Sequence, residues 1–153
     1  MLALVIILLS VYMVLTKSLE VKHTVVEKIK VLFVAPEEEP KEMTILNTLK
    51  TKQKLVKGRI EVCYILEDNE ICLICNEEGK LNGSLPNRDI GYDVIYGNFI
   101  IVGDDYVNGD FISLTPEQIK KYKNYFNKES IQKTKNRVNA KQLVIELKNN
   151  FLV

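Results

Sequence analysis

The stretch CNEEGKLNGSLPNRDIGYDVIYGNFIIVG, residues 75–103, contains the two patterns that decide the fold. Its first half is polar and rich in Gly, Asn and Pro, a composition typical of turns. Its second half, from Asp93 to Gly103, is apolar and rich in β-branched and aromatic residues. We therefore expect one bent strand or two strands there, with Gly97 at the bend.

Further strands are predicted before this stretch. The compact apolar run IKVLFVAP, Ile29–Pro36, is ended by a proline and has the pattern of a buried strand. Residues 59–75, RIEVCYILEDNEICLIC, predict a β-hairpin whose turn lies at Asp68 and Asn69. These segments supply the predicted sheet.

A short helix is predicted between those strands. Residues 37–42, EEEPKE, are expected to form a charged loop. Residues 44–58 then predict a helix with apolar residues seven apart on one face and Gly58 as its C-terminal cap. Lys52 falls where an apolar residue would suit the core face, which weakens this helix locally.

The helix with the clearest sequence signals is predicted in SLTPEQIKKYKNYF, residues 113–126. Thr115 is the predicted N-cap, Pro116 takes the first helical position and Gln118 completes a capping box. One face of this helix is apolar and consists of Ile119, Tyr122 and Phe126.

At 153 residues the chain has the length of one ordinary domain. The predicted elements make it an α+β domain, with a small mixed or antiparallel sheet and two to three packed helices. The formal net charge of +1 hides a segregation, because residues 17–58 carry +3, residues 59–112 carry −8 and residues 113–153 carry +6. Either these regions form solvated faces that complement each other, or the basic C-terminal helix predicted over residues 128–153 binds nucleic acid or anionic lipid.

The three cysteines argue against a disulfide framework because their number is odd. Cys72 and Cys75 form a CxxC within ICLIC, which has strand character. Side chains three apart on a strand point to opposite faces, so this pair suits neither a redox motif nor a zinc site. With Cys63 they are expected to serve as small hydrophobes in a reducing cytoplasm, with no metal and no cofactor.

The chain opens with a long apolar run that carries no charge from Met1 to Thr16. Even extended to Leu19 past Lys17, it is short for a membrane anchor, which needs about 20 apolar residues. Lysines follow the run, so an anchor would leave the rest of the chain in the cytoplasm. Three interpretations of Met1–Leu19 stay open: a membrane anchor, an extension from a wrongly assigned start, or a buried element of the domain.

A set of motifs runs in order through the rest of the chain. They are KVLFVAP, the G-x-IEV step at Gly58–Val62, CNEEGKLNGSLPNR, the D-x-I-x-G-x-F run from Asp93 to Phe99, Val102-Gly103, and FISLTPEQIKKYKNYF. In order and spacing they resemble the domain-of-unknown-function 3846 family over residues 29–126. The resemblance implies a compact α+β domain in a phage or mobile-element setting, and it supplies no established activity.

Candidate site residues gather in the turn-rich half of the central stretch. Arg88 offers a rigid fork of donors for a carboxylate or phosphate, in a chain with 18 Lys and 3 Arg. Asn87 beside it adds an amide, and the predicted ligand- or partner-binding site is completed by Asn76, Glu77, Lys80 and Asp93. The structural alternative is that Arg88 ties the loop down through an ion pair with an acidic neighbour: Glu77, Asp89 or Asp93.

No catalytic residue is predicted, because the only histidine, His23, lies outside the family-like region and no phosphate-loop pattern exists. We expect a non-enzymatic module that binds a protein or a small anionic ligand. One alternative is an acidic mimic of nucleic acid that inhibits a host DNA-binding enzyme. Another is a hydrolase that uses the acidic pairs Glu77-Glu78 and Asp104-Asp105.

Overall fold

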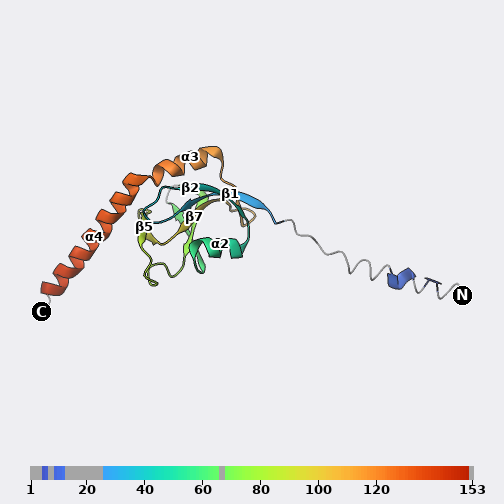
Figure 1. The fold of residues 1–153 in the computed structure, drawn as a ribbon, viewed down its shortest axis with the longest axis horizontal. Coiled ribbons are helices and arrows are strands. Elements are labelled where there is room, and N and C mark those ends of the chain that lie inside the picture. Colours follow the sequence, from blue (N-terminus) through green and yellow to red (C-terminus); the bar gives the residue numbers. More distant parts are fainter. Residues whose placement is uncertain (1–4, 7–8, 13–25, 66–67, 152–153) are drawn as a thin grey trace.

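The computed structural model describes residues 5–6, 9–12, 26–65 and 68–151. Within these residues, six strands form one antiparallel sheet in the order β2–β1–β7–β4–β3, with β8 paired to the second half of β7 (Figure 1). Strands β5 and β6 form a separate antiparallel hairpin. The strands are β1 Lys28–Val34, β2 Lys41–Leu46, β3 Ile60–Ile65, β4 Asp68–Asn76, β5 Pro86–Asp89, β6 Val94–Tyr96, β7 Phe99–Asp105 and β8 Asp110–Ile112. The helices are α2 Leu49–Val56, α3 Pro116–Tyr125 and α4 Lys128–Phe151. The predicted α+β class is confirmed.

Strands β1, β7 and β4 lie in the middle of the sheet and bury both of their faces. In β4, Ile71, Leu73 and Cys75 pack into one apolar cluster, whereas Cys72 and Ile74 pack into the other. Because side chains alternate along a strand, a strand covered on both sides is a continuous apolar run in the sequence. The prediction that Cys72 and Cys75 face opposite sides of one strand is confirmed.

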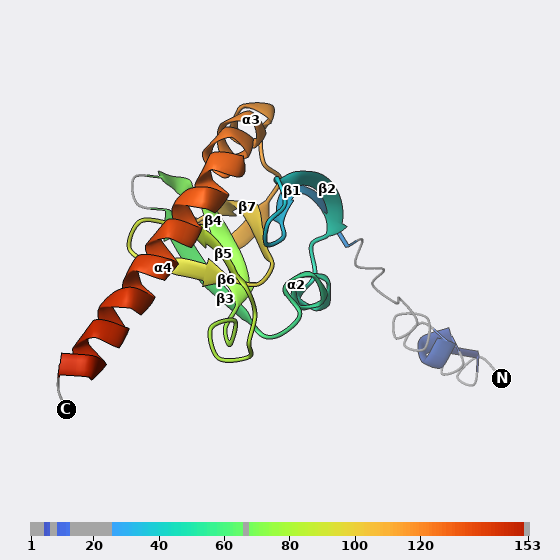
Figure 2. The same ribbon diagram turned by 60° about the vertical axis from the view of Figure 1, so that its left-hand side comes forward.

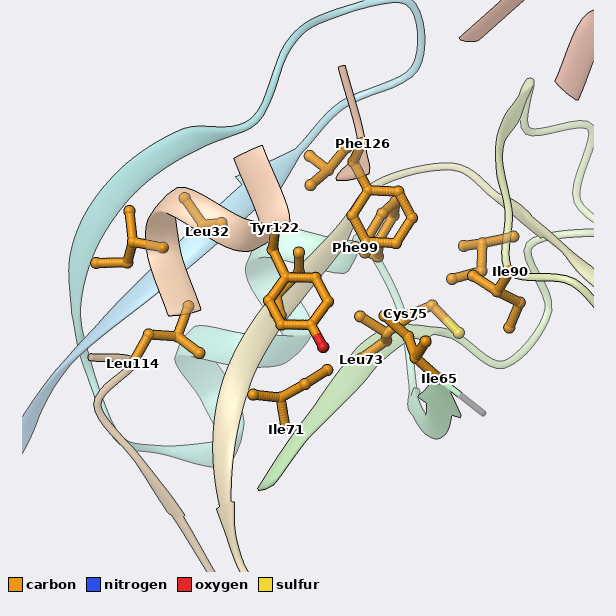
Figure 3. Packing of buried hydrophobic residues seen from close by; sticks show 14 residues of the cluster. Leu32, Ile65, Ile71, Leu73, Cys75, Ile90, Phe99, Leu114, Tyr122 and Phe126 are labelled. Atoms are coloured by element: carbon orange, nitrogen blue, oxygen red, sulfur yellow. The ribbon is translucent and has the colours of Figure 1, made fainter. Parts of the chain in front are cut away.

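One face of the sheet is covered by α3 and the β5–β6 hairpin (Figure 3). Phe126, the C-cap of α3, meets Phe99 of β7 edge to face, with ring centroids 5.4 Å apart. Ile90 and Ile95 bring the hairpin into the same cluster. The hairpin is therefore fixed against the sheet by apolar burial as well as by polar contacts.

Helix α3 begins where the sequence predicts. The Oγ1 atom of Thr115 accepts a hydrogen bond from the Gln118 amide at 3.2 Å, and Gln118 Oε1 accepts one from the Thr115 amide at 2.9 Å. Pro116 follows the N-cap. The predicted apolar face is buried and consists of Ile119, Tyr122 and Phe126.

The opposite face of the sheet is covered by α2, which contributes Val56 to the second cluster. Lys52 of this helix is buried as well. Its Nζ donates to Asn47 Oδ1 at 2.6 Å and lies 4.9 Å from the centroid of the Phe111 ring. Burial lowers the pKa of Lys52. These contacts accommodate the lysine that the sequence places on a core face.

Helix α4 packs on the hairpin with its first half and then extends away from the sheet (Figures 1 and 2). Thr134 is buried, and its Oγ1 accepts a hydrogen bond from the Asp89 amide at 2.9 Å. Arg137 pairs with the Asp89 carboxylate and donates to the Gly91 carbonyl at 2.9 Å. All residues from 139 to 150 are exposed.

The sequence prediction for residues 37–58 is partly wrong. Residues 41–46 form β2, because they pair with β1 from Lys28 to Phe33. The helix therefore begins only at Leu49. The left-handed residue at its end is Lys57, with φ of 60°, rather than Gly58.

The predicted turn of the β3–β4 hairpin is also wrong. Asp68 already pairs with Ile65, so Asp68 and Asn69 lie in β4 rather than in the turn. By contrast, Gly97 has a φ of 74° and separates β6 from β7, which confirms two strands with a bend at this glycine.

Most of the predicted anchor segment, Met1–Leu19, lies outside the described residues. Of that segment, residues 5–6 and 9–12 are described, and they are helical. Across the ranges that the structure describes, no helix is both long and apolar enough to cross a membrane.

Candidate functional site

An open pocket of about 500 Å³ lies between the edge strand β3, the loop after β4 and the β5–β6 hairpin. We call it the hairpin pocket. Four of the six residues predicted as site residues line it, namely Asn76, Glu77, Lys80 and Asp93. The pocket thus brings together residues from both sides of the turn-rich loop.

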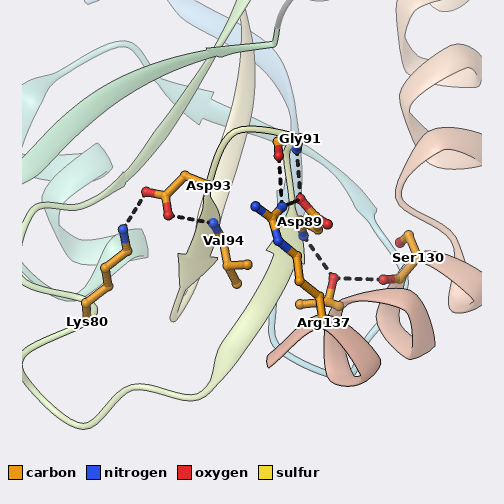
Figure 4. Close-up of polar contacts among 8 residues, drawn as sticks. Lys80, Asp89, Gly91, Asp93, Val94, Ser130 and Arg137 are labelled. Atoms are coloured by element: carbon orange, nitrogen blue, oxygen red, sulfur yellow. Dashed lines mark hydrogen bonds and ion pairs between the residues drawn. The ribbon is translucent and has the colours of Figure 1, made fainter. Parts of the chain in front are cut away.

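The loop after β4 approaches the hairpin closely at Gly79. A Cβ atom there would lie 2.6 Å from the Tyr96 carbonyl oxygen, so the backbone approach requires glycine. The approach brings Lys80 to Asp93, and the two form an ion pair at the pocket wall (Figure 4). Asp93 also accepts a hydrogen bond from the Val94 amide at 2.8 Å.

The electrostatics of this pair favour its ionised form. Burial raises the pKa of Asp93, but the hydrogen bonds from Lys80 and from the Val94 amide outweigh it and lower that pKa below its ordinary value. The hydrogen bond to Asp93 raises the pKa of Lys80. At neutral pH the pair therefore carries one charge of each sign and no net charge.

The side chains of Asn76 and Glu77 are engaged by other protein groups at the pocket wall. Asn76 is buried, and its Nδ2 donates to two carbonyl oxygens at the end of α2, at 3.2 and 3.1 Å. Its Oδ1 accepts a hydrogen bond from the Glu78 amide at 2.9 Å. Glu77 is exposed and forms an ion pair with Arg59 at 3.2 Å.

Arg88, the predicted centre of the site, lies in the protein interior, where it is 0% exposed. Its Nε and Nη2 donate to the Phe126 carbonyl at 3.2 and 3.0 Å, and Nη2 also donates to the Glu38 carbonyl at 2.6 Å. Its Nη1 donates to Asn87 Oδ1 at 2.8 Å. Burial lowers the pKa of Arg88 to about 10, which still leaves the guanidinium charged at neutral pH.

Asn87 is buried beside Arg88 and completes this arrangement. Its Nδ2 donates to the carbonyls of Val34, at 3.0 Å, and Gly97, at 2.7 Å. Together the two side chains join β1, the hairpin and the end of α3. A ligand at the surface does not reach this guanidinium, so we assign Asn87 and Arg88 a structural role.

The structural alternative for Arg88 predicted that this residue holds its loop in place, but it predicted ion pairs with acidic neighbours. Each acidic neighbour pairs with a different base: Glu77 with Arg59, Asp89 with Arg137 and Asp93 with Lys80. Arg88 instead binds backbone carbonyls of segments 38 and 50 residues away in the chain. Such distant partners leave no local pattern in the sequence.

The residues of the hairpin pocket that the sequence analysis did not select include Glu61, Cys63, Cys75, Tyr64, Tyr92 and Tyr96. Tyr92 Oη donates to the Tyr64 carbonyl at 3.0 Å and thereby joins the hairpin to β3. The one available signal is the alternation along β3, which places Glu61 and Cys63 on the same face.

The pocket also contains the exposed carboxylate of Glu61. Lys80 and Asp93 balance each other, and Glu77 is balanced by Arg59. Glu61 has no ion-pair partner among the residues that the structure describes. Tyrosine rings and this carboxylate favour a cationic or ring-bearing ligand over an anion.

Several acidic residues outside the pocket have local or basic partners. Glu78 contacts Arg59 at 3.3 Å, and Asp105 accepts hydrogen bonds from the amide and side chain of Asn108 at 3.1 and 2.7 Å. Asp68 and Asp89 form ion pairs with bases from residues 113–153, namely Lys121 and Arg137. These contacts agree with the interpretation of the charge segregation as faces that complement each other.

A family model described as Domain of unknown function (DUF3846) matches residues 29–127, and the chain belongs to this family. The match covers the sheet, the hairpin and α3, and it ends where α4 begins. Comparison with curated proteins and with solved structures found no match. The family resemblance seen in the motifs is thus confirmed, and it brings no assigned activity.

Proposed function

We propose that this domain is a non-enzymatic module that binds a small molecule in the hairpin pocket, and that the ligand carries a positive charge next to a flat ring. One observation carries the proposal: Tyr92, Tyr96 and the unpaired carboxylate of Glu61 surround one open pocket of about 500 Å³. That volume suits a small ligand.

The charge of the pocket decides the ligand class. An anionic ligand, as expected from Arg88, would meet the carboxylate of Glu61, whereas the lysine of the pocket wall, Lys80, is held by Asp93. A cationic group gains attraction to Glu61 and to the faces of the tyrosine rings. The family resemblance adds a phage or mobile-element setting to this proposal.

Three matched probes test the proposal: benzylamine, benzyl alcohol and benzoate, which share a ring and differ in charge. Each is titrated into the isotope-labelled full chain while backbone amide shifts are recorded. Benzylamine should bind most tightly and benzoate least, with shifts in β3, the loop after β4 and the hairpin. Absence of shifts with all three probes, or a preference for benzoate, would contradict the proposal.

A pair of variants locates the binding. Tyr92→Ala removes a pocket ring and should weaken benzylamine binding. Tyr106→Ala removes a ring that is 85% exposed between β7 and β8 and does not line the pocket, so binding should be unchanged. Equal binding by both variants would place the probe elsewhere on the molecule.

A further inference from the structure

Two thiols that are 12 residues apart in the chain meet across neighbouring strands. Cys63 of β3 and Cys75 of β4 lie on the same face, and their Sγ atoms are 3.7 Å apart. Glu61 is paired directly with Cys75 in the strand register. Donor atoms of Glu61, Cys63 and Cys75 all lie within 4.8 Å of one another.

The separation of the two sulfurs is that of ligands on one ion. Tetrahedral zinc with Zn–S distances of about 2.3 Å places two sulfur ligands about 3.8 Å apart. A disulfide would need about 2.05 Å, so the free thiols already stand at a ligand distance rather than a bonding distance. The third donor is the Glu61 carboxylate, which has an oxygen within 4.8 Å of both sulfurs.

Burial falls steadily across the three donors. Cys75 is buried, Cys63 is half-buried and Glu61 is exposed, and all three line the hairpin pocket. An ion held among them therefore has its protein ligands on the sheet side and its remaining position toward the pocket. Three protein ligands with one open position are the arrangement of zinc sites that bind a further ligand.

The two thiols form a hydrogen bond with each other. The hydrogen bond with Cys75 lowers the pKa of Cys63, whereas the same hydrogen bond and burial raise the pKa of Cys75. A divalent cation replaces the thiol protons: both thiols become thiolates bound to the ion, and two protons leave to solvent.

We propose that Glu61, Cys63 and Cys75 form a binding site for a thiophilic divalent metal ion, zinc foremost, whose fourth position opens into the hairpin pocket. Thiolate donors select zinc and its softer relatives over magnesium and calcium. The proposal stands without any organic ligand, but it uses the same Glu61 carboxylate that the cationic ligand would meet. The two ligands bind in competition, so benzylamine is titrated into the metal-free chain.

Cobalt(II) is the probe, because its thiolate complexes give a charge-transfer absorption band. Reduced full-length chain is freed of reductant without air and titrated with cobalt, then with zinc. We expect one ion per chain, a thiolate-to-cobalt band, and loss of that band as zinc displaces cobalt. Binding without the band would show that the thiols are not ligands and would overturn the proposal.

The variants have an internal control in the third cysteine. Cys63→Ser and Glu61→Gln should each weaken cobalt binding by roughly tenfold or more, the scale of disturbed metal ligation. Cys72→Ala changes a buried thiol on the opposite face and should leave the band intact. Unchanged cobalt affinity with a band of full intensity in Cys63→Ser, or loss of the band in a folded Cys72→Ala, would overturn the assignment.

Tyr92→Ala separates this site from the organic ligand. It should keep the cobalt band and lose benzylamine binding, so each proposal can fail while the other holds. Loss of the cobalt band in a folded Tyr92→Ala variant would contradict the assignment of the three ligands.

Discussion

Two cationic side chains of the same turn-rich segment have opposite surroundings. Arg88 is buried and satisfied by backbone carbonyls, whereas the Lys80 side chain is 52% exposed and pairs with one carboxylate at the pocket wall. The guanidinium offers five donors in a fixed plane and can join several carbonyls at once, while the ammonium is a single charge on a flexible stem. Lysine therefore cannot replace arginine at position 88, and the role of Arg88 there is structural.

Among the substitutions that test this comparison, Arg88→Lys should cause the largest loss of stability. Lysine keeps the charge but cannot reach the carbonyls of Phe126 and Glu38 together, so buried acceptors lose their donors. We expect a loss of about 2–4 kcal/mol in the free energy of unfolding. Chemical denaturation of the variant measures it.

Arg59→Lys is the matched control. Its side chain is 69% exposed and contacts Glu77 and Glu78 at the surface. The change should cost at most about 1 kcal/mol. If both variants lost similar free energy of unfolding, the hydrogen bonds from Arg88 to buried carbonyls would not contribute more than a surface ion pair.

Elements with local signals were predictable to the residue. The capping box at Thr115 and the apolar face of α3 need only neighbours in the sequence, and both are confirmed. Strand β2 has a charged, mixed sequence, and its extended form comes from pairing with β1 across the sheet. The position of Arg88 likewise depends on carbonyls that no local pattern reveals.

The contact between Cys63 and Cys75 was missed in the sequence analysis because a different register was assumed for the β3–β4 hairpin. A turn at Asp68 and Asn69 would pair Val62 with Cys75 and send the Cys63 side chain to the other face. The observed register pairs Glu61 with Cys75, which puts both thiols on one face. A shift of one residue exchanges the two faces of a strand, and the observed register also shifts between Cys63 and Ile65. The pair could not be inferred without both the turn and this irregularity.

Asp68 is intermediate in burial between Arg88 and the exposed ion pair of Lys80 with Asp93. Its side chain is 13% exposed and accepts hydrogen bonds from Lys121, at 2.6 Å, and from the Tyr122 hydroxyl. Asp68→Asn weakens both bonds, and we expect a loss of about 1–2 kcal/mol at neutral pH. Thermal unfolding of the variant and the natural chain gives the difference.

The same residue predicts a dependence on pH. Burial raises the pKa of Asp68, but the hydrogen bonds from Lys121 and Tyr122 outweigh it and lower that pKa below its ordinary value of 3.8. Because the folded pKa is the lower one, this stabilisation is present above the ordinary value and is lost as the pH falls through the folded value. The gap between natural chain and Asp68→Asn should therefore narrow in acid. Parallel pH profiles would contradict the assignment.

Lys52→Met tests a buried cation that has fewer partners than Arg88. Methionine keeps much of the stem and removes a charge that is held by one amide oxygen and one ring face. We expect the free energy of unfolding to rise by about 1 kcal/mol, because the cost of desolvating the ammonium disappears. Lys54→Met, on the exposed side of the same helix, should be neutral. A clear loss of stability in Lys52→Met would show that the contacts with Asn47 and Phe111 outweigh desolvation.

Lys80→Gln should have the smallest effect on stability and the clearest effect on the pocket. Its ion pair with Asp93 joins two side chains that are 52% and 43% exposed, so its loss should change the free energy of unfolding by less than about 1 kcal/mol. The change frees the Asp93 carboxylate beside Glu61 and makes the pocket more negative. Benzylamine should then bind up to about fivefold more tightly, the equivalent of roughly 1 kcal/mol, and benzoate should not gain. The amide-shift titration measures both affinities. If Lys80→Gln instead destabilised the fold as strongly as Arg88→Lys, the contrast between the structural role of Arg88 and the surface ion pair of Lys80 would be wrong.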